Sequence, residues 1–231
     1  MPDTSAAANA PRATAATPAR QRPKRRGFSR PELHVQVTLH STHAQRVAGR
    51  NMMEVARALY TIAVILHVIG DQDKADQVEE IVAGKIRALS EKLQKQLKSC
   101  RSQREDAGIT QFPVYRYPLK ITMRISSPEL SQYASLIQAL DTLSIETDTL
   151  WLGGLVTNRQ HANIAYQWRR ELLRLADEIT RIESMARTSA ASADAAQEIA
   201  ERTEDAREVM TIDEGGELDL EDEEPESVAT A

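Results

Sequence analysis

Basic and hydroxyl-bearing side chains recur at alternate positions of one short segment of this sequence. Lys120, Thr122 and Arg124 share this spacing, and Arg116 extends the row beyond a proline. Arginine and lysine can donate hydrogen bonds to O6 and N7 of guanine, and a threonine hydroxyl or methyl can contact neighbouring base edges. Because alternate residues of a β-strand share one face, the spacing predicts a cationic strand surface suited to contacting DNA in a groove.

The intervening positions give the opposite face of the same segment. Residues 117–125 alternate without interruption, which predicts a half-buried strand. The apolar members of this alternation are Tyr117, Leu119, Ile121, Met123 and Ile125. The polar face also has a plainer interpretation, because an exposed strand needs polar residues and lysine at a sheet edge discourages aggregation. DNA contact and simple solvation therefore both remain open.

A second alternation comes earlier in the chain, over residues 33–40. Its apolar members are Leu33, Val35, Val37 and Leu39. The polar residues between them are His34, Gln36, Thr38 and His40. This pattern predicts a second half-buried strand. Two strands alone form a marginal sheet, so we expect the apolar faces of both to pack on helices.

Four longer segments show the apolar spacing of amphipathic helices. The periodicity predicts helices over about residues 42–69, 71–104, 128–152 and 157–185. Thr42 and Gln45 have capping-box spacing at the first start, and Thr157 and Gln160 have it at the last. Pro128 suits a first helical turn. The elements together predict a mainly α protein with a small β component, in which two short antiparallel strands pack on a bundle of long helices.

The second helix carries an apolar seam with near-heptad spacing. Its members are Val78, Val82, Ile86, Leu89, Leu93 and Leu97. Such a seam fits either an antiparallel partner helix in the same chain or a coiled coil between two chains. Trp151 and Trp168 are spaced like their apolar neighbours, so we expect both in the core.

The two ends of the chain carry opposite charge. Residues 1–30 hold seven basic residues against Asp3 alone, and residues 213–231 hold nine acidic residues and no basic one. Such biased segments cannot bury enough apolar surface to offset the entropy of ordering. We therefore expect a disordered basic arm over residues 1–30, a folded domain over 31–189 and a mostly disordered acidic tail over 190–231. Residues 1–30 carry +6 and residues 213–231 carry −9. Subtracting both from the net charge of −5 leaves −2 for residues 31–212, and this value argues neither for nor against a nucleic-acid partner.

Each end has more than one interpretation. Arg25 and Arg26 in the basic arm could hold DNA phosphates, a contribution that weakens with salt, or the arm could be a solvated leader. The acidic tail could compete with DNA for the basic face, contact the transcription machinery, or simply keep the protein soluble.

Nothing in the sequence is typical of a catalytic or metal site. It contains no Gly-rich phosphate loop, paired catalytic carboxylates or nucleophile elbow. His34 and His40 would lie about 20 Å apart along one strand face, and no cluster completes a tetrahedral ligand set. We therefore expect no enzymatic activity, no cofactor, no metal and no small-molecule substrate.

Cys100 is the one cysteine, so no intramolecular disulfide forms and a reducing compartment is expected. The most apolar stretch, around residues 59–69, is too short to span a bilayer, and the N-terminus lacks the apolar core of a secretory signal. These features predict a soluble, cytoplasmic protein without a membrane partner.

Two short groups of residues resemble landmarks of a known family. The first is Leu39-His40-Ser41-Thr42-His43-Ala44 followed by Gly49-Arg50, and the second is Tyr115-Arg116-Tyr117-Pro118-Leu119. Together they are similar to the AcaB-like proteins, transcriptional regulators carried on conjugative plasmids and integrative conjugative elements. The similarity covers about residues 33–185 and leaves both ends outside.

The resemblance implies a homodimeric regulator of conjugative-transfer genes that binds double-stranded DNA, with a fold related to ribbon-helix-helix proteins. In that fold, strands from two protomers pair and enter the major groove. The corresponding part of this chain would be residues 116–185, with Lys120, Thr122 and Arg124 facing the groove and Arg116 at its margin. Helix N-termini near Ser126 or Thr157 would hold phosphates.

Two questions stay open at this point. Residues 117–125 could pair with their symmetry mate or with residues 33–40 of the same chain. The protein could also be a non-enzymatic accessory or interaction protein of a transfer or integration complex, in which case residues 78–97 would bind a different partner and the basic strand face would only be solvated.

Overall fold

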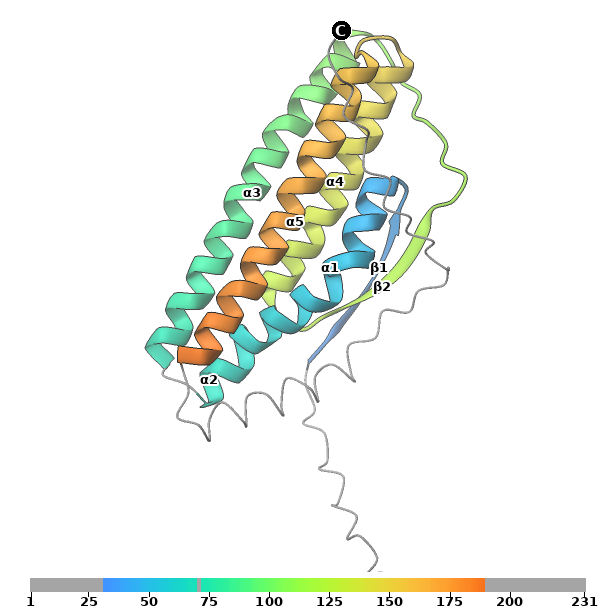
Figure 1. The fold of residues 1–231 in the computed structure, drawn as a ribbon. Helices are drawn as coiled ribbons and strands as arrows, with labels where there is room; N and C mark the ends of the chain where they lie inside the picture. Colours follow the sequence, from blue (N-terminus) through green and yellow to red (C-terminus); the bar gives the residue numbers. More distant parts are fainter. Residues whose placement is uncertain (1–30, 70–71, 190–231) are drawn as a thin grey trace, which may run out of the picture. The chain divides into compact units, whose positions relative to one another are not determined.

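The computed structural model describes residues 31–69 and 72–189, and both predicted tails, with Arg25 and Arg26, lie outside these ranges. The elements in chain order are β1 (Leu33–Leu39), α1 (Thr42–Tyr60), the π-helical turn η1 (Thr61–Ile65), α2 (Leu66–Ile69), α3 (Gln72–Asp106), β2 (Leu119–Ile125), α4 (Pro128–Leu152) and α5 (Asn158–Ser189) (Figure 1). This arrangement confirms the predicted mainly α class with a small antiparallel sheet.

The two strands pair with each other in the same chain. β1 and β2 are antiparallel, with a register that runs from Leu33 opposite Ile125 to Leu39 opposite Leu119. Of the two pairings that the sequence left open, the structure shows the one within the chain. Leu39 and Met123 are buried on the inner face, which packs on α4.

The strand over residues 117–125 was predicted two residues too long. β2 begins at Leu119, and Tyr117 is 79 % exposed instead of joining the apolar face. Pro118 explains the difference, because it lacks the N–H that a ladder hydrogen bond needs and favours the end of a strand.

Helix starts follow the expected capping chemistry, with one shift. Ser41, not Thr42, caps α1, because its Oγ accepts a hydrogen bond of 3.3 Å from the Ala44 backbone N–H. The predicted capping box of α5 is confirmed: the Gln160 N–H donates to Thr157 Oγ1 at 3.3 Å, and the Thr157 N–H donates to Gln160 Oε1 at 3.0 Å.

The apolar seam of α3 is buried by helices of its own chain. Val82, Ile86, Leu93 and Cys100 lie in the core, where α3 packs on α4 and α5. Of the two arrangements predicted for this seam, the structure shows the one in which it packs against helices of the same chain. In Figure 1, α3 lies on the opposite side of α4 and α5 from the two strands.

The two tryptophans have different environments. Trp168 is buried on α5, as predicted. The prediction for Trp151 is wrong, because its side chain is 40 % exposed at the end of α4. Its indole Nε1 donates to Asn158 Oδ1 at 2.6 Å and its ring stacks on His161, so a polar partner and a neighbouring ring hold it at the surface.

Candidate nucleic-acid interface

The outer face of the two strands carries six polar side chains in three facing pairs. The register sets His34 opposite Arg124, Gln36 opposite Thr122 and Thr38 opposite Lys120. We call these six residues the ribbon face. The three β1 residues and Lys120 are exposed, and Thr122 and Arg124 are partly exposed. The structure thus brings three predicted site residues together on one accessible surface.

The dimensions of the ribbon face suit a DNA groove. Three alternate residues on a strand span about 13 Å at about 3.3 Å per residue. That length corresponds to about four base pairs at 3.4 Å each. A two-stranded ribbon also fits the major groove of B-DNA, which is about 12 Å wide.

The remaining predicted contact residues lie beyond the strands. Arg116 is exposed in the segment before β2, not in the strand itself. His34, Gln36 and Thr38 of β1 were not predicted as contact residues, although their alternation was visible, because only the pairing register places them on the same surface. At the opposite end of the face, Glu32 Oε2 lies 3.8 Å from His34 Nε2.

A buried carboxylate holds the end of β1 against the bundle. Asp141 on α4 is 5 % exposed and accepts hydrogen bonds from the backbone N–H groups of His40, at 3.0 Å, and Ser41, at 2.7 Å. His40 Nδ1 lies 3.1 Å from the second oxygen. This carboxylate satisfies backbone donors between β1 and α1 and so fixes the direction in which β1 leaves the bundle.

A glutamine ties the other strand to the same place. Gln45 Nε2 donates to the carbonyl oxygens of Leu39 and Tyr117, each at 3.0 Å. One side chain of α1 therefore connects the end of β1 with the segment that leads into β2. The ribbon face is positioned by this amide as well as by apolar packing.

A second polar network anchors the segment between α3 and β2. The Tyr115 hydroxyl donates to Asp148 on α4, and the other Asp148 oxygen contacts His161 on α5. Burial raises the pKa of Tyr115, and the Asp148 carboxylate raises it further, so the phenol stays a hydrogen-bond donor. Tyr115 thereby restrains the neighbouring Arg116.

His43 lies beside this network in its neutral form. Burial lowers the pKa of His43, and the Arg169 guanidinium lowers it further. Its Nδ1 is buried without a hydrogen-bond partner among the described residues. A neutral ring in this position adds no charge to the interface.

The predicted phosphate sites at helix starts receive little support. Ser127 caps α4 by accepting from the Leu130 N–H at 3.2 Å, and the buried Glu129 carboxylate lies in the same first turn. A negative charge there opposes a phosphate. At α5, the Thr157 and Gln160 side chains already occupy the capping positions.

One group of possible metal ligands occurs among the described residues, at His67, Asp76 and Glu79. His67 presents Nδ1 to Asp76 at 3.6 Å and Nε2 to Glu79 at 3.0 Å. One ligand atom of each residue lies within 4.8 Å of the other two. Such groups of exposed acidic residues are common without an ion, so this geometry alone does not define a metal site.

The fold and this surface define an α+β protein in which a two-stranded ribbon lies on a helical bundle. No model of a protein family matches the sequence, and no curated protein does. Among solved structures, the chain is similar to AcaB from uropathogenic E. coli, with 40 % sequence identity and a TM-score of 0.72. The match covers 76 % of this chain and 91 % of that one.

This similarity is sufficient to assign the family: the chain belongs to the AcaB-like proteins. The resemblance noted from short motifs is thereby confirmed at the level of the family.

Within residues 31–69 and 72–189, no helix combines the length and the apolar character needed to cross a membrane.

Proposed function

We propose that the protein is a sequence-specific DNA-binding regulator of conjugative-transfer genes and that its ribbon face contacts base edges in the major groove. The observation that carries this proposal is the register, which sets Thr38 opposite Lys120 and His34 opposite Arg124 on an accessible surface. Lysine and arginine donate to guanine, and glutamine, such as Gln36, can pair with adenine. No enzymatic step is needed for this activity.

The anchoring contacts support the same proposal. Groove contacts discriminate between bases only when the side chains are held in register with the duplex. Asp141 and Gln45 fix the ends of the strands, and Tyr115 restrains the segment that carries Arg116. Arg116 and the basic arm with Arg25 and Arg26 would contribute phosphate contacts, which position a protein on DNA without reading the sequence.

A homodimer is part of the proposal. A ribbon that contacts about four base pairs gives limited specificity, whereas two ribbons related by a twofold axis read two half-sites. In a ribbon-helix-helix dimer, strands of the two protomers pair, and in this chain β2 already uses one edge for β1. A second copy would therefore add strands to a ribbon that one chain already forms, whereas in a ribbon-helix-helix dimer the ribbon forms only when two protomers pair.

The test is a gel shift with duplexes from the promoters beside the gene, repeated over a series of salt concentrations. The proposal predicts a discrete complex that outlasts a large excess of unrelated duplex. Each phosphate contact lowers the logarithm of the affinity by about 0.9 per tenfold rise in salt. Equal affinity for all duplexes at every salt concentration would refute sequence-specific recognition.

A second candidate function rests on an exposed apolar surface near the α4–α5 turn. Its members are Trp151, Leu152 and Leu155. Grouped exposed apolar side chains often mark protein contacts, which favours an accessory role in a transfer or integration complex. Failure of every promoter duplex in the gel shift would leave this function as the better explanation.

A further inference from the structure

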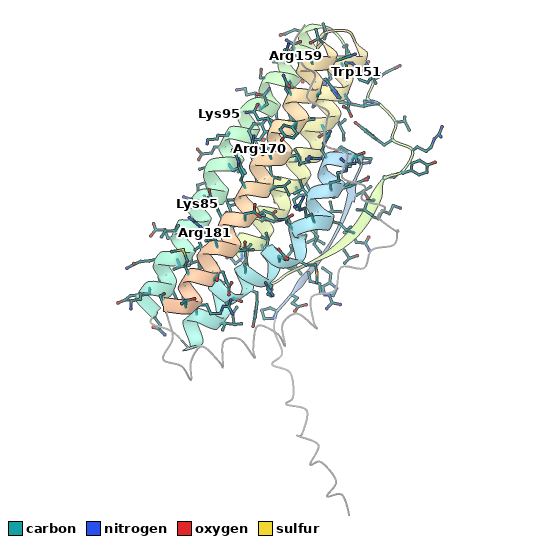
Figure 2. All side chains as sticks on the ribbon, in the orientation of Figure 1. Lys85, Lys95, Trp151, Arg159, Arg170 and Arg181 are labelled. Atoms are coloured by element: carbon teal, nitrogen blue, oxygen red, sulfur yellow. The ribbon has the colours of Figure 1, made fainter. Side chains whose placement is uncertain are left out.

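Exposed cations line the two neighbouring helices α3 and α5. They are Lys85, Lys92 and Lys95 on α3 and Arg159, Arg170, Arg174 and Arg181 on α5, and we call them the basic stripe. Lys85, Lys95, Arg159, Arg170 and Arg181 are labelled along the face that Figure 2 shows. From Arg159 to Arg181 the stripe extends about 33 Å at about 1.5 Å per helical residue.

A shallow groove runs along part of the stripe, between the two helices. Leu89 and Leu175 are among the residues that line it, with Lys85, Lys92 and Arg174 beside them. Glu171 and Glu178 also line the groove, which thus combines an apolar floor with edges of mixed charge that carry one more cation than carboxylates. This composition suits a peptide that carries both carboxylates and a few aliphatic side chains.

Only part of the stripe's charge is balanced by the helices themselves. Lys85 Nζ lies 2.8 Å from Glu178, and Arg174 Nη1 lies 3.1 Å from Glu171. The other members, in the part of the chain that the structure describes, have no carboxylate within ion-pair distance; they are Lys92, Lys95, Arg159, Arg170 and Arg181. These five cations outnumber the two exposed carboxylates, Glu91 and Asp177, that lie one helical turn from Lys95 and Arg181. The excess gives a positive field that attracts an anionic chain.

We propose that the acidic segment over residues 213–231 of this same chain docks on the basic stripe. The segment holds nine acidic residues and no basic one, so it carries −9. Residues 31–212 carry −2 in total, so the attraction depends on the local charge of the stripe. Its apolar residues include Leu218 and Leu220, spaced among the carboxylates. The carboxylates of the segment therefore match the unpaired cations of the stripe, and its leucines match the apolar floor of the groove.

The segment is close enough in sequence to reach this surface. α5 ends at Ser189, which lies about 12 Å along the helix from Arg181. The 23 residues 190–212 connect Ser189 with residue 213. A coil of that length has a root-mean-square reach of about 26 Å. An intramolecular partner at this distance acts at an effective concentration on the order of millimolar.

The position of the stripe favours the tail over a duplex as occupant. In Figure 1, α3 and the ribbon lie on opposite sides of α4 and α5, so a duplex held by the ribbon face does not cover the stripe. Docking itself does not depend on the proposed function. Its consequence does: if the protein binds DNA, a docked tail screens the stripe and lowers non-specific duplex binding.

The experiment is carbodiimide cross-linking of the full chain without DNA, followed by mass spectrometry. A carbodiimide joins lysine amines directly to nearby carboxylates, so only groups in contact are linked. We expect links from residues 213–226 to Lys92 and Lys95, at a yield that is independent of protein concentration. Raising NaCl from about 20 mM to about 500 mM should lower this yield several-fold, because screening shortens the range of the attraction.

A charge-reversal variant provides the control. Arg170→Glu with Arg181→Glu should reduce the links to Lys92 and Lys95 several-fold, since both lysines remain available. Arg87→Glu with Lys98→Glu, exposed positions of α3 outside the stripe, should leave the yield unchanged. Absent links, links mainly to Lys120, or links formed only between two chains would each overturn the proposal. If added duplex, and not the tail, protects the stripe lysines from reaction, the surface is assigned to nucleic acid and the proposal is wrong.

Discussion

The Asp141 carboxylate accepts a hydrogen bond of 2.7 Å from the backbone N–H of Ser41, a residue 100 positions earlier in the chain. The same carboxylate also accepts from His40 and is buried. This contact joins the end of β1, the start of α1 and the middle of α4. It is therefore the polar contact on which the placement of the ribbon most depends.

We expect Asp141→Ala to destabilise the fold by about 2–4 kcal/mol, because it leaves two backbone donors buried without an acceptor. Urea denaturation followed by circular dichroism measures this change. Asp177→Ala removes an exposed carboxylate from α5 and should change the free energy of unfolding by less than about 0.5 kcal/mol. Equal stabilities of the two variants would show that the Asp141 contacts do not hold the strand.

Tyr115→Phe removes the hydroxyl that donates to Asp148 and keeps the ring. We expect a loss of about 1–2 kcal/mol in unfolding free energy and faster amide hydrogen exchange over residues 114–119. Tyr166→Phe is the matched control, because that ring is 44 % exposed on α5. Unchanged exchange in the Tyr115 variant would mean that the phenol does not restrain the segment before β2.

Glu183 predicts a pH-dependent effect on stability. Burial raises the pKa of Glu183 above its usual 4.5, although Arg187 and Arg57 act in the opposite direction. The folded protein therefore holds this proton more tightly than the unfolded chain does. Its contribution to stability is fully present below pH 4.5 and is lost as the pH rises through the folded-state pKa.

Replacing this carboxyl by a neutral amide should remove the free-energy cost of burying a charged carboxylate. We expect Glu183→Gln to raise the unfolding free energy at pH 8 by up to about 1 kcal/mol and to match the parent at pH 4. Denaturant titrations at the two pH values measure the difference. A variant that is less stable than the parent at pH 8 would show that the ion pair with Arg187 outweighs the cost of burial.

The sequence was sufficient to predict the helices and strands but not how they pair and pack. Alternation and helical periodicity depend on neighbouring residues, so both strands and the seam of α3 were found. The pairing of β1 with β2 depends on contacts between residues at least 80 positions apart, for which a single sequence offers no local signal. The ribbon face was therefore predicted as one strand and found as two.

The polar anchors show the same limit. Asp141, Glu146 and Asp148 bind partners on other elements; for example, Arg104 Nε donates to Glu146 at 2.7 Å. A signal was present, because residues 128–152 contain four acidic residues and no basic one, which indicates that the donors come from elsewhere. Local mistakes had local causes, such as Pro118 at the start of β2 and the capping of α1 by Ser41.

The central claim is tested most directly by duplex binding of Lys120→Ala with Arg124→Ala, compared with Arg87→Ala with Lys98→Ala as a control of equal charge change on exposed positions of α3. If the ribbon face reads bases, the first pair weakens binding to the promoter duplex by about thirtyfold or more while unrelated duplex is affected much less. Circular dichroism should be unchanged in both variants. A footprint of the first variant identical to that of the parent protein would contradict the claim.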